Sequence, residues 1–194
     1  MSDGLVGILL AAGRGARFDA TGQRNKLLQP IASGEEVAVA AARNLIAALP
    51  SVLAVVRPGN DTLAARLSEA GCKVTVCEQS DEGMAASLVH ALSCKRTAQG
   101  WVIALADMPY VRPATISALA AAIEKGAGIA APVTAGRRGN PVAFANRHLD
   151  ELLQLRGDEG ARKLLNAHQV TAIAVDDPGI LQDIDKPSDL HAWN

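Results

Sequence analysis

Short apolar runs alternate along the chain with longer segments rich in alanine and leucine, and this alternation is the strongest constraint on its fold. The runs have strand length and are nearly all apolar, which is typical of strands buried on both faces. They are Leu5–Leu10, Val52–Val56, Lys73–Cys77, Trp101–Ala106, Ile129–Val133 and Val170–Val175. Between them, apolar residues recur every three or four positions, as on one face of a helix. These segments are Val37–Leu49, Thr62–Ala70, Met84–Ser93, Ile116–Lys125 and the stretch around Ala161–Ala167.

Such an order of elements predicts an α/β fold of three layers, α/β/α, with helices on both faces of a mostly parallel sheet. A turn cluster, Ala135–Pro141, separates Ile129–Val133 from Pro141–Phe144 and predicts an antiparallel hairpin within that sheet. The whole chain, residues 1–194, is expected to form one domain, since domains commonly hold ~100–200 residues. Ligands of these sheets gather at the carboxyl ends of the strands, so the loops there are the first place to look for function.

Composition excludes several classes of partner. Nineteen Lys and Arg against twenty Asp and Glu give a net charge of −1, so no basic excess exists to neutralise a nucleic-acid backbone. Aromatic residues make up 3%, too few for base-stacking platforms or a membrane belt. The first apolar run stops at Gly13 and lacks a basic segment before it, unlike a signal peptide or a membrane span. We therefore expect a cytoplasmic protein that binds neither nucleic acid nor membrane.

Cysteine and histidine give no pattern of a metal site. The cysteines, Cys72, Cys77 and Cys94, are odd in number and show no C-x-x-C spacing, which favours reduced thiols. The histidines lack metal-ligand spacing, so each is expected to be solvated or bonded to a local partner. They are His90, His148, His168 and His191.

The loop after the first strand, Leu10–Arg17, is rich in glycine and other small residues. Such a loop lets backbone N–H groups approach phosphate oxygens, and Arg17 and Lys26 could balance the negative charge. A P-loop is excluded because Lys26 is followed by Leu27, and a dinucleotide fingerprint lacks its third glycine, since Phe18 stands there. A glycine turn flanked by solvated cations is the alternative to a phosphate site.

Further motifs follow in a fixed order and give the loop a context. Together with this loop and Asn25–Leu28, the chain resembles the MobA-like nucleotidyltransferases, and among them the molybdenum cofactor cytidylyltransferase branch most. The resemblance covers nearly the whole chain and implies a Rossmann-like nucleotidyltransferase fold. The motifs are Glu82–Leu88, Leu105–Pro109, Gly139–Val142, Gly157–Arg162 and Asp183–Leu190.

This resemblance implies an enzyme that transfers CMP from CTP to the phosphate of molybdenum-molybdopterin, with Mg²⁺ as cofactor. The products would be molybdopterin cytosine dinucleotide and pyrophosphate, and a molybdenum hydroxylase would be the client that receives the dinucleotide. Two alternatives stay open. One is a guanylyl- or other nucleotidyltransferase with a different phosphorylated acceptor. The other is a carrier or insertion factor that binds the cofactor without catalysis.

The resemblance also assigns site residues. Arg17, Lys26 and Asp107 would be catalytic, and Asp107 and Asp185 would hold the magnesium ion. Alternatives are a loop or capping role for Asp107 and an N-cap role for Asp185. The remaining residues would bind the nucleotide: Leu10, Ala11, Ala12, Gly13, Arg14, Gly15, Gly83 and Ser87.

Gly83 and Ser87 would face the base of the nucleotide, and Ala12 would determine whether a pyrimidine or a purine fits. Gly83 would admit the base closely and Ser87 would read its edge, although Ser87 could instead bond to the preceding helical turn. Ala12 stands where cytidylyl-transferring relatives carry alanine and guanylyl-transferring ones carry glycine. The extra methyl would narrow the floor beneath the base and favour a pyrimidine.

The acceptor side and the departures from the family pattern complete the expectations. Gly139–Val142 and Gly157–Arg162 would line the acceptor site, with Arg137, Arg138 and Arg162 as candidate ligands of its phosphate. Lys26 stands nine residues after Arg17, further than the family usually places it, so residues 19–23 resemble an insertion. If that insertion did not fold back, Lys26 would not reach the phosphates. Asn140 replaces a histidine of the family.

Overall fold

A mixed sheet forms the centre of the computed structural model, which describes residues 4–21, 23–157 and 161–191. In this part of the chain the strand order is β3-β2-β1-β4-β7-β5-β6, and β8 also pairs with β5. The strands are β1 (Leu5–Leu10), β2 (Val52–Val56), β3 (Lys73–Val76), β4 (Gly100–Leu105), β5 (Ile129–Thr134), β6 (Arg137–Arg138), β7 (Val142–Ala145) and β8 (Thr171–Ala174).

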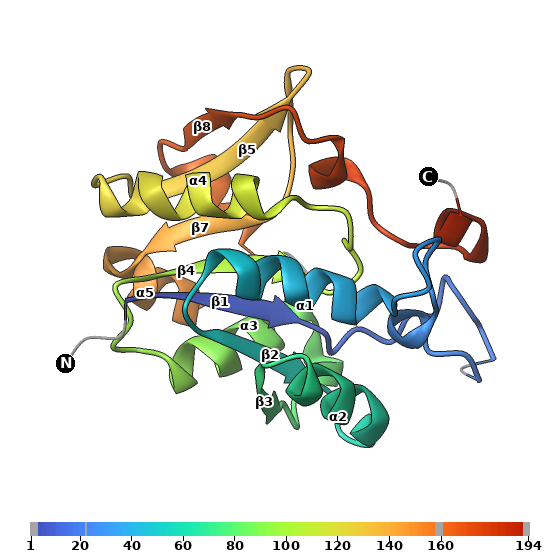
Figure 1. Cartoon of the computed structure of the whole chain (residues 1–194). Helices are drawn as coiled ribbons and strands as arrows, with labels where there is room; N and C mark the ends of the chain where they lie inside the picture. Colours follow the sequence, from blue (N-terminus) through green and yellow to red (C-terminus); the bar gives the residue numbers. More distant parts are fainter. Residues whose placement is uncertain (1–3, 22, 158–160, 192–194) are drawn as a thin grey trace.

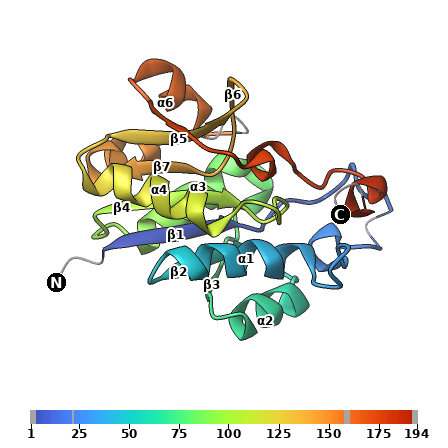
Figure 2. The same cartoon turned by 45° about the horizontal axis from the view of Figure 1, so that its top comes forward.

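Helices cover both faces of the sheet, which confirms the predicted three-layer α/β/α fold (Figures 1 and 2). On β1, Leu5 and Leu9 belong to the core under α1, α2 and α4, whereas Val6 and Ile8 belong to the core under α3, α5 and α6. Alternate residues of a strand point to opposite faces, so a fully apolar strand serves both cores. The helices are α1 (Val37–Ala48), α2 (Asp61–Glu69), α3 (Met84–Cys94), α4 (Pro113–Glu124), α5 (Leu149–Leu153) and α6 (Arg162–Ala167).

The predicted antiparallel hairpin is present, and it lies inside the sheet. Strand β7 pairs antiparallel with both β4 and β5, while β1, β2, β3 and β4 pair in parallel. Gly100 at the start of β4 permits the close approach of β7, because a Cβ there would lie 2.5 Å from the Phe144 carbonyl oxygen.

Strands β3 and β8 differ from the prediction that the strands are buried on both faces. Residues of β3 and β8 are exposed or half-buried, because β3 pairs only with β2 and β8 only with β5. Helix α4 begins at Pro113, three residues before the periodic segment Ile116–Lys125, because proline suits the first helical turn. Helix α5 was not predicted, since its five residues are too few to show helical periodicity.

A C-terminal segment, residues 176–185, runs from β8 to the carboxyl end of β4 and lies beside the loop after β1 (right of Figure 1). The buried carboxylate of Asp177 accepts bonds from the Arg112 amide at 2.9 Å, the Thr115 hydroxyl at 2.6 Å and the Gly179 amide at 3.0 Å. The Ile184 amide then donates to the Asp107 carbonyl oxygen at 2.8 Å. These bonds fix the next residue of the segment, Asp185, beside Asp107.

No helix among residues 4–21, 23–157 and 161–191 has the length and apolar character needed to span a bilayer.

Candidate active site

A cleft of about 570 Å³ opens at the carboxyl ends of β1 and β4. It is lined by all the residues predicted for catalysis, metal binding and nucleotide binding except Ala11, and also by Asp183, Met84 and Asp81. Ala11 is 1% exposed, and its amide donates to the Val55 carbonyl oxygen at 2.9 Å, so this amide serves the sheet. The structure thus brings together residues that are spread over most of the sequence.

The charged groups of the cleft form one connected cluster. The Lys26 ammonium nitrogen lies 2.8 Å from Asp107 Oδ2 and 3.6 Å from Asp185 Oδ1. The second oxygen of Asp185 pairs with the Arg17 guanidinium. The Lys26 side chain is only 12% exposed, whereas that of Arg17 is 81% exposed. Lys26 is therefore held between two carboxylates, whereas Arg17 pairs with the second oxygen of Asp185 and is exposed to solvent.

The longer loop between Arg17 and Lys26 does fold back. The Asp19 carboxylate accepts bonds from the Thr21 hydroxyl and amide and from the Arg24 amide at 2.7 Å. These hydrogen bonds, with that of the Thr21 hydroxyl the strongest, lower the pKa of Asp19. Gly22 within this loop lies outside the described residues. Asn25 then accepts a bond from the Leu27 amide at 3.0 Å and begins the 3₁₀ turn Lys26–Leu28.

The backbone of the loop after β1 offers donors to a ligand. Within the described residues, the backbone amides of residues 12–17 have no hydrogen-bond acceptor. The Gly15 carbonyl oxygen accepts the amides of Phe18 and Asp19, and Gly15 has a φ of +64°, which favours glycine. Unpaired amides on a glycine-containing turn are suited to bind the oxygens of an anion such as a phosphate.

Within the residues that the structure describes, neither Asp107 nor Asp185 caps a helix. The Asp107 carboxylate bonds to Lys26, not to a backbone amide. At the start of the turn Pro187–His191 the capping carboxylate belongs to Asp189, which accepts the Lys186 amide at 2.7 Å and the Asp185 amide at 2.9 Å. These bonds, that from Lys186 first, lower the pKa of Asp189. The alternative reading of Asp185 as an N-cap is therefore not supported.

The two carboxylates fit a divalent cation. Asp107 Oδ1 is buried and has no hydrogen-bond partner, and a buried carboxylate oxygen without a partner is costly. Asp107 and Asp185 already share one cationic group, the Lys26 ammonium. Hard cations such as Mg²⁺ and Mn²⁺ prefer oxygen ligands and use one or two carboxylates together with substrate phosphates.

The opposite wall of the cleft carries Gly83 and Ser87. Gly83 has a φ of +112° and precedes α3, a conformation that side chains other than glycine rarely adopt. Ser87 is 4% exposed, and its hydroxyl bonds to the Cys77 thiol. Burial raises the pKa of that thiol, and the bonds with Gln79 and Ser87 oppose the shift. The hydroxyl of Ser87 thus already has a partner that the sequence analysis did not name.

An ion pair joins the two walls of the cleft. Arg14 contacts Asp81 through two guanidinium nitrogens, each at 2.9 Å, and Arg57 lies 3.5 Å from the same carboxylate oxygen. Arg14 and Asp81 are both more than half exposed, so this pair contributes little to stability. The sequence analysis missed Asp81, because no motif contains it.

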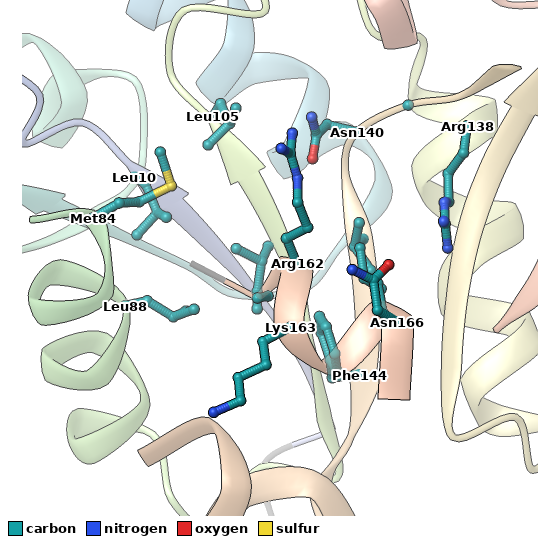
Figure 3. A pocket seen from close by; sticks show the side chains of 15 residues that line it. Leu10, Met84, Leu88, Leu105, Arg138, Asn140, Phe144, Arg162, Lys163 and Asn166 are labelled. Carbon is teal, nitrogen blue, oxygen red and sulfur yellow. The ribbon is translucent and has the colours of Figure 1, made fainter. Parts of the chain in front are cut away.

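A second, larger cavity of about 1030 Å³ adjoins the first and shares Leu10, Met84 and Leu105 with it. Figure 3 shows Met84 and Leu88 on α3 at one side, and Arg162, Lys163 and Asn166 on α6 at the other. Apolar residues of the strands and of α3 line much of it, and the polar side chains come from β6, the segment after it and α6.

Most of the residues predicted for the acceptor line this second cavity. Arg138, Arg162 and Gly139–Val142 (except Pro141) do so, whereas Arg137 does not. Asp158–Gly160 of the predicted acceptor segment lie outside the described residues. Lys163 and Asn166 were missed, although their position beside Arg162 in one helix was a usable signal.

Comparison with known proteins identifies the family of this chain. The profile of the MobA-like NTP transferase domain matches residues 7–172. Purine catabolism protein PucB of Bacillus subtilis is 30% identical over 95% of this chain and 93% of its own. Molybdenum cofactor guanylyltransferase of Cupriavidus pinatubonensis is 31% identical over 97% of this chain and 95% of its own.

Among solved structures, Rv0371c of Mycobacterium tuberculosis has a TM-score of 0.81 at 29% identity, covering 95% of each chain. A manganese complex of Rv0371c has a TM-score of 0.73, also at 29% identity, over 97% of this chain and 94% of that one. The matching profile, the full-length relatives and the shared fold lead to one conclusion. The chain belongs to the MobA-like NTP transferase family and is a nucleotidyltransferase.

Proposed function

We propose that this protein is a Mg²⁺-dependent cytidylyltransferase, a single domain acting in the cytoplasm. It transfers CMP from CTP to the phosphate of molybdenum-molybdopterin and releases pyrophosphate. The observation that carries the proposal is the cluster in the smaller cleft. There the Lys26 ammonium lies within 2.8 Å of Asp107 and 3.6 Å of Asp185, next to a loop of unpaired amides.

In the reaction, an oxygen of the acceptor phosphate forms a bond to the α-phosphorus of CTP. The bond from that phosphorus to the bridging oxygen breaks, and pyrophosphate leaves with the electron pair. The nucleophile is already anionic, so the protein needs no Ser, Cys or His nucleophile. Its contribution is positioning and stabilisation of negative charge.

Each group of the cleft has a role in this scheme. The amides of residues 12–17 bind the triphosphate, and Lys26 and Arg17 offset the charge that develops on the α-phosphate and the leaving pyrophosphate. Asp107 and Asp185 would hold the magnesium ion, which would supply neutralisation of phosphate charge. The Lys26 ammonium, which lies 2.8 Å from Asp107 and 3.6 Å from Asp185, would donate to phosphate oxygens once the nucleotide is bound.

The acceptor lies in the larger cavity under this proposal. The two cavities share Leu10, Met84 and Leu105, so reacting groups from each can meet at their border. Arg138 and Arg162 would bind acidic groups of the acceptor, and the apolar floor would contact its ring system. The molybdenum cofactor as acceptor is supported by the name of the 31% identical relative from C. pinatubonensis, a molybdenum cofactor guanylyltransferase. A molybdenum hydroxylase is then the proposed client.

The choice of base separates two candidates. Ala12 lines the cleft and is 6% exposed, and its methyl group supports a pyrimidine as the base. The name of the same relative, a guanylyltransferase, favours GTP and keeps guanylyl transfer as the second candidate. A carrier without catalysis would need neither the Lys26 ammonium nor the Asp107 carboxylate, so the cluster favours turnover.

The test measures pyrophosphate release with CTP or GTP, in the presence and absence of Mg²⁺ and molybdenum-molybdopterin. The proposal expects release only with all components and a higher kcat/KM with CTP. A higher kcat/KM with GTP would transfer the assignment to the second candidate. Tight binding of the molybdenum cofactor without any consumption of nucleotide would identify a carrier instead.

A further inference from the structure

A second cluster of metal-binding side chains lies far from the cleft. His148 Nδ1 lies 3.3 Å from Glu151 Oε1, and His168 Nε2 lies 2.7 Å from Glu151 Oε2. One ligand atom from each residue can be chosen so that all lie within 4.8 Å of one another. The carboxylate thus bridges two imidazoles that are 20 residues apart in the sequence.

The position of this cluster is fixed by the fold. His148 follows β7, whose last residue, Ala145, is opposite Gly100 at the amino end of β4. The cleft lies at the carboxyl end of the same strand, so the cluster and the cleft lie near opposite ends of β4. His148 is 8% exposed, and its Nε2 would lie 2.8 Å from a Cβ at Gly128, so glycine there leaves room for the ring.

The two rings are packed as well as hydrogen-bonded. The centroids of His148 and His168 are 4.8 Å apart at 70°, and the Phe144 ring packs edge-on to His148 at 6.5 Å. The two packed imidazoles already face one carboxylate, so a metal ion could take the place of the protons in these hydrogen bonds with little rearrangement.

Two imidazoles and one carboxylate are a donor set that divalent transition metals favour. Zn²⁺ binds His nitrogen and carboxylate oxygen at about 2.0–2.2 Å, which sets tetrahedral ligand atoms roughly 3.4 Å apart. The His148–Glu151 separation of 3.3 Å is close to this value, the His168–Glu151 separation of 2.7 Å is shorter, and all three ligand atoms lie within 4.8 Å of one another. Mg²⁺, in contrast, prefers an all-oxygen environment, so the two clusters differ in the metal they select.

We propose that His148, Glu151 and His168 form a binding site for a divalent transition-metal ion of the Zn²⁺ class, and that the ion fixes the position of α6. His168 follows directly after α6 and its amide bonds back to Leu164. Helix α6 carries Arg162, Lys163 and Asn166 into the wall of the larger cavity. Metal ligation joins the end of this helix to α5. Helix α5 packs against α3 on the same face of the sheet.

The test titrates metal-free protein with Co²⁺, a visible probe of Zn²⁺ sites, in excess Mg²⁺. Wild type is expected to bind one equivalent with the visible absorption of a four- or five-coordinate ion. Glu151→Gln and His168→Gln each remove one ligand, so the affinity should fall by more than ~100-fold. Zn²⁺ should raise the Tm of the wild type and leave the Tm of both variants unchanged.

Two control variants exclude other sites. Asp107→Asn weakens the acidic pair in the cleft, and His90→Gln removes a histidine whose Nε2 lies 4.0 Å from Cys94 Sγ. Both should keep the one-equivalent signal. Loss of the signal in either control, or its retention in both Glu151→Gln and His168→Gln, would overturn the proposal. Absence of Co²⁺ binding in the wild type would do the same. No substrate is used, so this result is independent of the proposed function.

Discussion

The two adjoining cavities are lined by different kinds of residues. The smaller cleft is lined by loop backbone and by a compact group of charged side chains with Lys26 at its centre. The Lys26 side chain is only 12% exposed. The larger cavity has an apolar floor from strands and α3, and its charges, such as Arg138 and Arg162, are exposed at the rim. The difference separates roles: a rigid charged cleft suits chemistry on phosphates, and a broad apolar cavity suits recognition of a larger partner molecule.

If this division is right, substitutions in the smaller cleft should reduce kcat and those in the larger cavity should raise the KM for the acceptor. A group that acts in the transition state alters kcat, whereas a group that binds ground and transition states equally alters KM. The following predictions, ordered by the size of the expected effect, test this separation.

The largest effect is expected for Asp107→Asn. The change keeps the shape of the side chain but removes the charge that the proposed magnesium site requires, so kcat should fall by about 10³-fold. Pyrophosphate release at saturating substrates measures it. Asp183→Asn is the matched control, because Asp183 lines the same cleft, and its loss should stay below about tenfold. Equal losses in the two variants would contradict a specific role for Asp107.

Lys26→Met should lower kcat by about 10²-fold, because it removes the cation that offsets phosphate charge. It also removes the cation that Asp107 and Asp185 share and leaves Asp185 paired with Arg17 alone, which should reduce the free energy of unfolding by roughly 1–2 kcal/mol. Urea denaturation measures this change, and Mg²⁺ should stabilise the variant more than the wild type. Arg14→Met breaks the exposed pair with Asp81 and should cost less than about 0.5 kcal/mol. An unchanged urea midpoint for Lys26→Met would argue against the shared cation.

The larger cavity offers a pair of adjacent residues for comparison. Arg138 lines it and Arg137 does not, although both lie exposed on β6. Arg138→Ala should raise the KM for the acceptor by about 30-fold, the value of a lost charge-assisted hydrogen bond, without changing the KM for the nucleotide. Arg137→Ala should leave both constants near wild type. An equal rise in both variants would indicate a general effect of surface charge.

The smallest effect is expected for Ala12→Gly, which removes one methyl group from the floor of the cleft. A single methyl contact commonly changes discrimination by about tenfold, so the ratio of kcat/KM for CTP over GTP should fall by that factor. The ratio is measured by competition between the two nucleotides. A ratio that stays constant would show that another residue selects the base.

The division also explains what the sequence could predict. Leu10–Arg17 and Asp107 follow strands in contiguous motifs, so pattern and resemblance located them together. The contacts of Lys26 depend on the hydrogen bonds that Asp19 and Asn25 make within the intervening loop. The nine-residue spacing from Arg17 gave no indication that Lys26 would reach the cleft. Resemblance named Lys26 correctly as a residue of the cleft because it compares motifs rather than distances.

The residues that sequence analysis missed are those positioned by tertiary packing. Lys163 and Asn166 enter the larger cavity only because α6 lies opposite α3. Asp189 takes the capping role considered for Asp185, and only its bonds to two amides distinguish the two aspartates. His148 and Glu151 are three residues apart, but His168 reaches Glu151 from 17 residues further along the chain. No local sequence pattern encodes that second contact.

The most direct test of the account is a crystal structure with a non-hydrolysable CTP analogue and Mn²⁺, located by its anomalous signal. The account predicts Mn²⁺ bound to Asp107 and Asp185, the triphosphate against the amides of residues 12–17, and the Lys26 ammonium bonded to a phosphate oxygen. Triphosphate density outside this cleft, or Lys26 still bonded to both carboxylates with no Mn²⁺ beside them, would contradict it.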